Sequence, residues 1–170
     1  KRRKMLGMWL FYEDKSKSRL QTAKLIYDTS AKSFDYKDYS EAVSAAYYSM
    51  YYIVHSYIAK TYNIKISEGL RGVHSITKDL ILYYLVKTSK LAKYLYEEYS
   101  KALDSTAKIQ KLGLEDFEEK AYSYADKYEK AKVAREIFTY STTTSVEERH
   151  ARKSIETADE FISTIRQMMI

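Results

Sequence analysis

The longest apolar stretch of the chain, residues 39–60, predicts a mostly buried central helix. After Glu41 this stretch carries no charged residue until Lys60. Asp38 followed by Glu41 matches a capping box, in which the aspartate accepts a free backbone N–H and the glutamate reaches back. Small residues recur at steps of three and four, which places them on one helix face where a neighbouring helix can approach closely: Ala42, Ala45, Ala46 and Ser49.

A membrane span is the alternative to a buried helix for this stretch. Residues 42–59 have nearly the length that a span needs. However, three serines, His55 and several tyrosines interrupt the apolar character, and each tyrosine hydroxyl needs water or a partner. The pattern therefore favours a core helix of a soluble bundle, with no membrane contact.

Apolar residues at helical spacing predict further helices on both sides of the central one. The expected ranges are about 13–32, from 73 onward, 91 to about 112 with Gly113 as a stop, a helix through 117–138, and a last helix after 145. Residues 1–12 form an N-terminal extension. Its basic cluster, residues 1–4, is either an arm that touches phosphate or a solvated end. Its apolar part, residues 5–12, either begins the first helix or docks on a neighbour.

The helix through residues 117–138 carries one continuous stripe at alternating steps of four and three, which indicates a face turned toward a partner helix. Arg135 lies inside that stripe, where a guanidinium is costly unless something pairs with it. Either Arg135 pairs with a core carboxylate or carbonyl or extends to solvent, or it lines a pocket for an anion. The stripe consists of Phe117, Ala121, Tyr124, Tyr128, Ala131, Arg135 and Phe138.

Residues 140–145 are rich in hydroxyls and predict a turn, and Ser145 with Glu148 matches a second capping box. The last helix then repeats the four-and-three stripe. A seam this regular packs either on the bundle or on a second copy of the chain. Its members are Ala151, Ile155, Ala158, Ile162, Ile165 and Met169.

Composition supports one all-helical domain over residues 1–170. The chain has no proline and only 4 glycines, whereas all-β folds need more turn formers. The absence of cysteine excludes disulfides, cysteine-ligated zinc and thiol catalysis. No secretory signal is visible, so we expect a cytoplasmic protein. Abundant Lys, Glu, Tyr and Ile resemble the composition of proteins from hot environments, and the net charge of +6 favours a polyanionic partner.

Familiar catalytic and cofactor motifs are missing. Neither the dinucleotide fingerprint nor the P-loop occurs. His55, His74 and His150 are far apart in sequence, so nothing indicates a metal site. Adjacent acidic pairs such as residues 97–98 and 118–119 point in different directions on a helix and indicate solvated faces. We therefore expect no cofactor.

Three segments together resemble the HEPN family of small helical bundles. The first is DYSEAVSAAYYSMYYIVHSYIAK, with an acidic start, an alanine and a Tyr-Tyr-small-Met core. The second is LRGVHSI, similar to a short His-x-Gly-Val segment that opens the next helix, with Leu70 where the family has histidine. The third is AREIFTY followed by a polar turn and ARKSIETADEFISTIRQMM. The resemblance covers residues 15–169, with an insertion at about 87–118.

The resemblance implies an up-and-down bundle of about five to six helices, usually dimeric. It also implies association with nucleotides or RNA, often beside a partner nucleotidyltransferase in toxin–antitoxin or defence modules. Many members are metal-independent ribonucleases, in which an arginine is followed by four to six residues and then by a histidine. Here Tyr140 stands where that histidine would follow Arg135. Tyrosine is a poor general base near neutral pH.

The residues and the resemblance together lead to a HEPN-like protein that binds RNA, a nucleotide or a nucleotidyltransferase without cleaving RNA. Its expected site residues are Arg135, Tyr140, Tyr48, Arg71 and His74. One alternative is a ribonuclease that uses His74 or His150. Others are a small helical subunit of an RNA-guided complex, whose basic surface binds RNA without a pocket, and a plain helical bundle in which the tyrosines belong to the core.

Overall fold

The computed structural model describes residues 7–34, 37–67, 69–103, 114–140 and 146–170. Within these ranges all regular structure is helical, which confirms the predicted all-α class. The elements are α2 (Met8–Lys32), α3 (Tyr39–Tyr62), α4 (Val73–Ile81), the π-helical segment η1 (Leu82–Val86), α5 (Lys90–Leu103), α6 (Leu114–Tyr140) and α7 (Glu148–Gln167).

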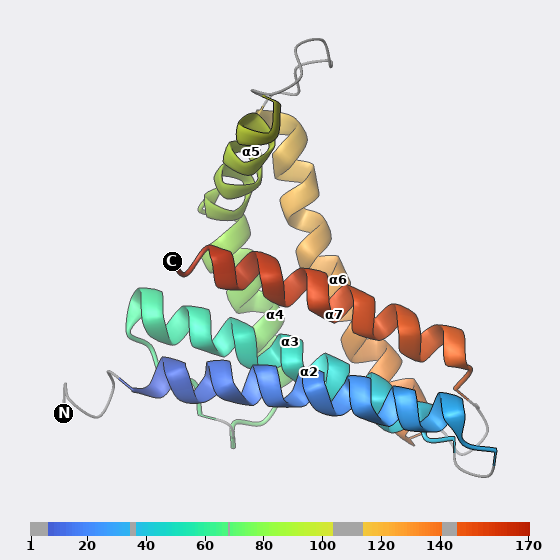
Figure 1. Cartoon of the computed structure of the whole chain (residues 1–170). Coiled ribbons are helices and arrows are strands. Elements are labelled where there is room, and N and C mark those ends of the chain that lie inside the picture. Colours follow the sequence, from blue (N-terminus) through green and yellow to red (C-terminus); the bar gives the residue numbers. More distant parts are fainter. Residues whose placement is uncertain (1–6, 35–36, 68, 104–113, 141–145) are drawn as a thin grey trace.

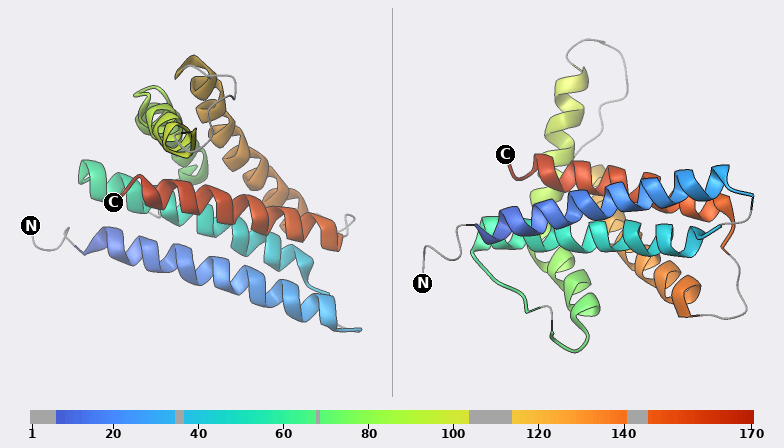
Figure 2. Two further views of the ribbon diagram at one scale, coloured as in Figure 1. Left: turned by 45° about the horizontal axis from the view of Figure 1, so that its top comes forward. Right: turned by 60° about the horizontal axis from the view of Figure 1, so that its bottom comes forward.

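Helices α2, α3 and α7 pack together as one group. In the second group, α4 and α6 cross a face of the first, while α5 packs on α6 and extends beyond it (Figure 1). Consecutive helices reverse direction in the α2–α3 and α5–α6 pairs, but these two pairs cross one another (Figure 2). The arrangement therefore departs from a simple up-and-down bundle. Helix α3 lies between the two groups and contacts α2, α4, α6 and α7.

The central helix is confirmed as α3, and its four small residues are all buried. The Asp38 side chain caps it, because Oδ1 accepts the backbone N–H of Glu41 at 3.2 Å. The reciprocal half of the predicted capping box is wrong. The backbone N–H of Asp38 donates instead to Oγ of Ser30, at 3.0 Å, so the hydroxyl comes from α2. Asn63, in the left-handed conformation, ends the helix.

Several predicted boundaries shift. Helix α2 begins at Met8, so the apolar part of the N-terminal extension starts the first helix, and Tyr12 is buried. Tyr140 is the last residue of α6 and does not belong to a turn. Helix α7 has Glu147 as its N-cap, without a side-chain cap. The basic cluster 1–4, the end of the predicted 91–112 helix with Gly113, and Ser145 lie outside the described residues.

Both predicted stripes are confirmed. On α6 the residues at 117, 121, 124, 128 and 135 are buried, while those at 131 and 138 are partly buried. All six stripe positions of the last helix are buried. Its seam packs against α3 and α2 of the same chain, which decides between the two predicted partners.

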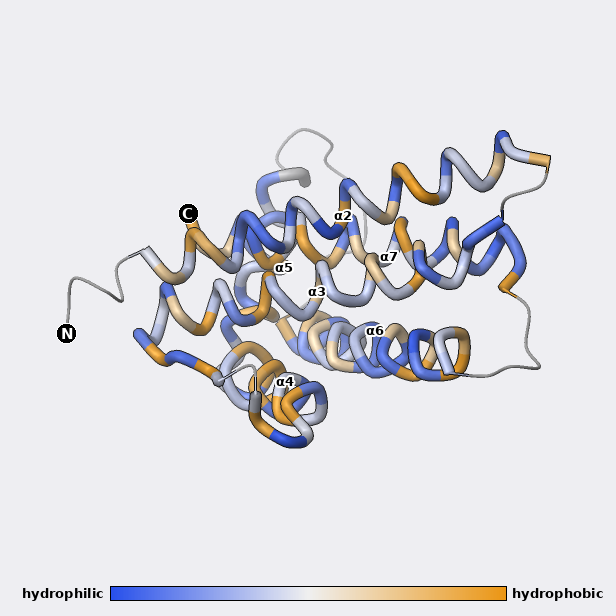
Figure 3. Tube along the Cα trace, turned by 90° about the horizontal axis from the view of Figure 1, so that it is seen from below, coloured by the Kyte–Doolittle hydropathy of each residue, from blue (hydrophilic) through white to orange (hydrophobic). Residues whose placement is uncertain are grey.

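Apolar and polar residues alternate along the helices in Figure 3. Across the described part of the chain, no helix combines the length and the apolar character that crossing a membrane requires.

Candidate functional site

Arg135 on α6 is only 9% exposed and is held by tyrosines. Its Nη2 donates to the hydroxyl of Tyr48 on α3 and to the hydroxyl of Tyr140 on its own helix, each at 2.9 Å. The guanidinium carbon also lies 5.3 Å from the ring centre of Tyr48, 5.2 Å from that of Tyr140 and 5.9 Å from that of Tyr47. Aromatic faces at this range attract a cation.

The charge of Arg135 has no carboxylate partner among the described residues, and its Nε is buried without a hydrogen bond. The sequence left open a core carboxylate or carbonyl as partner, but the structure supplies neutral phenols. Both N–H groups of Nη2 are used by these phenols. With respect to the described residues, the guanidinium thus keeps N–H donors and an uncompensated positive charge in a mostly buried position, where charge is costly.

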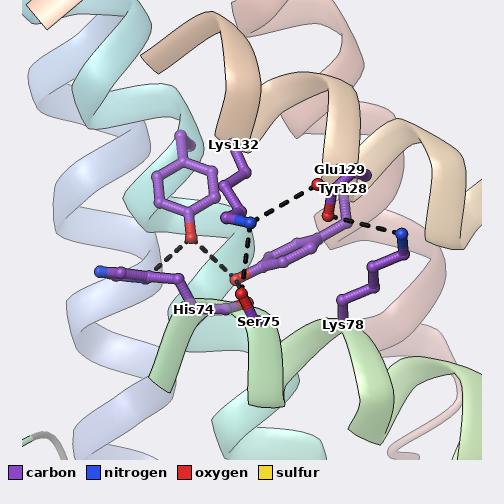
Figure 4. Close-up of polar contacts among 7 residues, drawn as sticks. His74, Ser75, Lys78, Tyr128, Glu129 and Lys132 are labelled. Atoms are coloured by element: carbon purple, nitrogen blue, oxygen red, sulfur yellow. Dashed lines mark hydrogen bonds and ion pairs between the residues drawn. The ribbon is translucent and has the colours of Figure 1, made fainter. Parts of the chain in front are cut away.

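His74 lies in the same place. Gly72, with φ of 75°, begins α4 in a left-handed turn that puts His74 on the first turn of the helix. Its Nδ1 is 2.8 Å from the hydroxyl of Tyr47, which is 2.9 Å from the hydroxyl of Tyr128 (Figure 4). The His74 ring also meets the ring of Tyr48 edge-on, with centres 5.8 Å apart.

Burial and positive neighbours tune these groups. Burial first, and then the charges of Arg135 and Lys132, lower the pKa of His74. Because its ordinary pKa is about 6.5, His74 is neutral at pH 7. Burial raises the pKa of Tyr47 and of Tyr128, so both phenols stay protonated. Nε2 of His74 has no hydrogen-bond partner among the described residues, which leaves that nitrogen available to a ligand.

A polar contact set fixes α4 against α6 beside these groups (Figure 4). Lys132 on α6 donates to the Ser75 hydroxyl at 3.3 Å and pairs with Glu129 at 3.5 Å. Glu129 also pairs with Lys78 on α4 at 3.6 Å. These partly exposed pairs add little stability, and they connect α4 to α6 beside the cluster.

The structure brings four of the five expected site residues together. Tyr48 and Tyr140 bond to Arg135, and His74 contacts Tyr48. Arg71 is exposed in the turn before α4, and within the described residues no hydrogen bond or ion pair joins it to the others. We call the assembled group the Arg135 cluster: Arg135, Tyr47, Tyr48, Tyr128, Tyr140 and His74.

Sequence reasoning missed two members of the cluster and its basic neighbour. Tyr128 bridges toward His74, and a signal was present, because it lies seven residues before Arg135 on the same stripe. Tyr47 carries the link between His74 and Tyr128, and only its adjacency to Tyr48 could have indicated it. Lys132 lies between Tyr128 and Arg135 at helical spacing from each, but nothing in the sequence distinguished it from the other lysines of α6.

The other two histidines lie elsewhere. His55 is buried on α3 and its Nε2 is 3.0 Å from the hydroxyl of Thr77. His150 on α7 stacks on Phe138, with ring centres 5.4 Å apart. In the ranges that the structure describes, no three His, Asp or Glu residues gather where they could hold a metal ion.

The fold and the site define a class: an all-helical protein with a buried arginine held by tyrosines next to a neutral histidine. No protein-family model, no curated protein and no solved structure matches the chain.

Proposed function

We propose that this protein binds the phosphate of a nucleotide or RNA at the Arg135 cluster, without cleaving it, as a HEPN-like module. One observation carries the proposal. The Arg135 guanidinium is held by neutral hydroxyl groups, lacks a carboxylate partner among the described residues, and keeps a buried Nε without an acceptor. A phosphate is the ligand that a planar guanidinium with spare donors binds best.

The surroundings of Arg135 suit such a ligand. Tyr140 is 68% exposed at the end of α6 and bonds to the guanidinium from the solvent side of the cluster. An exposed tyrosine ring beside a phosphate-binding group is a stacking surface for a base. The net charge of +6 adds a long-range attraction for a polyanion.

The residue at the family's histidine position favours binding without cleavage. Attack by a ribose 2′-hydroxyl needs a proton acceptor that titrates near neutral pH. At the position where the resembling family has its histidine, Tyr140 is engaged as a hydrogen-bond acceptor for Arg135. A neutral phenol in that role supports holding a phosphate rather than activating a hydroxyl.

The experiment measures binding of AMP and of a short single-stranded RNA at the Arg135 cluster, read from the His74 ring signals in NMR titrations of wild type, Arg135→Ala and Arg135→Lys. We expect Arg135→Ala to weaken binding by at least ten-fold. Arg135→Lys should be intermediate, because it keeps the charge and loses the planar pair of donors. Arg149→Ala removes the same charge from an exposed residue of α7 that already pairs with Glu147, and should bind like wild type.

If Arg135→Ala binds AMP and the RNA as tightly as wild type, the Arg135 cluster is not their binding site. The alternative is a scaffold subunit that binds RNA with a basic surface and no pocket. It predicts that substituting any exposed basic residue lowers the RNA affinity by a similar factor, and that the affinity falls steeply with salt concentration.

A second function, metal-independent RNA cleavage, is favoured by the position of His74. Its neutral imidazole lies in the Arg135 cluster, and in the tautomer whose Nδ1–H donates to Tyr47, Nε2 would be able to accept a proton. His150 stacks on Phe138 outside this cluster. The same RNA, incubated with the protein and a chelator, distinguishes the two functions. Cleavage that His74→Ala abolishes and His150→Ala spares would establish the ribonuclease.

The resemblance also motivates two parts of the proposal that concern partners. We expect a homodimer, which a solution mass of twice that of the chain would establish. We also expect a nucleotidyltransferase partner from a toxin–antitoxin or defence module, and co-purification with the product of a neighbouring gene would test this.

A further inference from the structure

A groove of about 420 Å³ lies between α6 and α7, and none of its lining residues belongs to the Arg135 cluster. Its lining includes Ala131, Ala134 and Phe138 of α6, and His150 of α7. On α6, Ala134 and Phe138 are four residues apart and share one face, which lies about a quarter turn from the face of Tyr128 and Arg135. The volume is in the range of small-molecule sites.

Part of the groove lining is apolar or aromatic. The two alanines leave a depression on α6, because a methyl group fills little space. Phe138 and His150 stack with an interplanar angle of 28° and form an aromatic wall. A planar ring would bury apolar surface against such a wall and gain the offset contacts that aromatic pairs prefer.

The rim of the groove is cationic. Lys130 and Lys153 line it, are exposed, and have no ion-pair partner among the described residues. Lys127 also lines it, but it pairs with Glu160 at 2.7 Å. Two unpaired ammonium groups on opposite helices, beside an apolar lining, match a ligand with a ring and a negative charge.

A polar atom of a lining residue lacks a partner. Nδ1 of His150 is buried and has no hydrogen-bond partner among the described residues. A buried polar group left unpaired is costly, and a ligand that turns the imidazole ring toward the groove would be able to pair with it.

We infer that the α6–α7 groove binds a small aromatic anion of the size of a nucleoside monophosphate. Its ring packs on Ala131, Ala134 and the Phe138–His150 wall, and its anionic group lies between Lys130 and Lys153. This site is separate from the Arg135 cluster and does not depend on the function proposed for that cluster.

Histidine NMR tests the inference, because the chain has 3 histidines and each reports a different place. His150 reports the groove, His74 reports the Arg135 cluster, and buried His55 is the internal reference. The protein is titrated with AMP, with adenosine, which keeps the ring without the charge, and with ribose 5-phosphate, which keeps the charge without the ring. We expect AMP to shift the His150 ring signals with an affinity at least ten-fold higher than either fragment.

Two variants and a control complete the test. Lys130→Gln with Lys153→Gln should weaken the effect of AMP on His150 by at least five-fold. Ala134→Met, which fills the depression, should weaken it as well. Lys93→Gln with Lys120→Gln removes the same charge from exposed residues of α5 and α6 outside the groove and should behave like wild type.

Several results would overturn the groove as a site. One is AMP shifting His74 alone, which would support the Arg135 cluster instead. Others are AMP shifting neither histidine, either fragment shifting His150 as effectively as AMP, or the control pair losing as much affinity as the rim pair.

Discussion

Two buried residues, Arg135 and His55, show how this core accommodates polar groups. Arg135 keeps its charge and is surrounded by phenols. His55 is held in its neutral form. The Thr77 hydroxyl donates its hydrogen to the carbonyl of Val73 at 2.8 Å, so it accepts from Nε2–H of His55. Nδ1 of His55 then carries no hydrogen, is buried, and has no hydrogen-bond partner among the described residues.

His55 gives folding stability a predictable dependence on pH. Burial, and secondly the neighbouring His74, lower its pKa to about 3. The unfolded chain therefore takes up a proton below about pH 6.5, while the folded protein does not until about pH 3. Stability is complete above pH 6.5 and is lost as the pH falls. The contribution of His55 amounts to about 2 kcal/mol between pH 7 and pH 5.

Urea unfolding of wild type and His55→Gln at pH 7 and pH 5 measures this contribution. Glutamine keeps a donor for Thr77 but does not titrate, so the decline between the two pH values should be smaller by about 2 kcal/mol in the variant. His74, whose pKa is also lowered, contributes to the decline that remains. Equal declines in both proteins would show that His55 is not held neutral by burial.

At the scale of the element, α6 serves the core and the site with one stripe. Phe117, Ala121 and Tyr124 face the core, and the same stripe continues to Tyr128 and Arg135 in the cluster. Because the spacing of four and three keeps these residues on one face, the core residues of α6 hold Arg135 against α3. Helix α3 in turn carries Tyr47 and Tyr48, which bond to Tyr128 and Arg135 of α6. The cluster therefore depends on how α3 is placed along α6.

The cap at the start of α3 gives a prediction at this scale. Asp38→Ala should lower the free energy of unfolding by about 1 kcal/mol, because the backbone N–H of Glu41 loses its acceptor. Thermal or urea unfolding measures the change. Asp28→Ala, at an exposed position within α2, removes the same charge and should change stability by less than about 0.5 kcal/mol. Equal effects would assign the loss to charge rather than to capping.

At the scale of the whole molecule, α3 is the shared contact of two helix groups. It packs on α2 and α7 on one side and on α4 and α6 on the other. A hydroxyl of α2 reaches it directly, since Ser16 donates to the backbone carbonyl of Ser49 at 2.8 Å in a buried position. Small residues on α3 permit this close approach of α2. The Arg135 cluster depends on the packing around α3, because α4 and α6 contact each other and both contact α3.

Enlarging a small residue of α3 should therefore disturb the molecule as a whole. Ala46 is 1% exposed, and Ala46→Leu should cost about 1–3 kcal/mol of stability because the core has no room for the added atoms. Urea unfolding provides the measurement. The same substitution at exposed Ala31, near the end of α2, should be close to neutral. A neutral Ala46→Leu would mean that the helices around α3 separate easily.

The sequence by itself determined the local features of this protein. Periodicity placed the central helix, the stripes of α6 and α7, and Arg135 on a buried seam, because residues three and four apart share a helix face whatever surrounds them. The capping aspartate of α3 was equally local. The resemblance to the HEPN family, together with the stripe, suggested Tyr48, Tyr140 and His74 as site residues beside Arg135. These four residues lie together in the structure, and their role in binding is the function proposed above.

Only the tertiary structure decided what surrounds those residues. Tyr48 is 87 residues from Arg135 and Tyr47 is 81 residues from Tyr128, so these bonds depend on how α3, α4 and α6 cross. The tertiary structure also decided that the backbone N–H of Asp38 donates to the Ser30 hydroxyl and not to the Glu41 carboxylate, and that a groove lies between α6 and α7. Helical periodicity states which face is buried, but the partner on that face is selected by packing between helices.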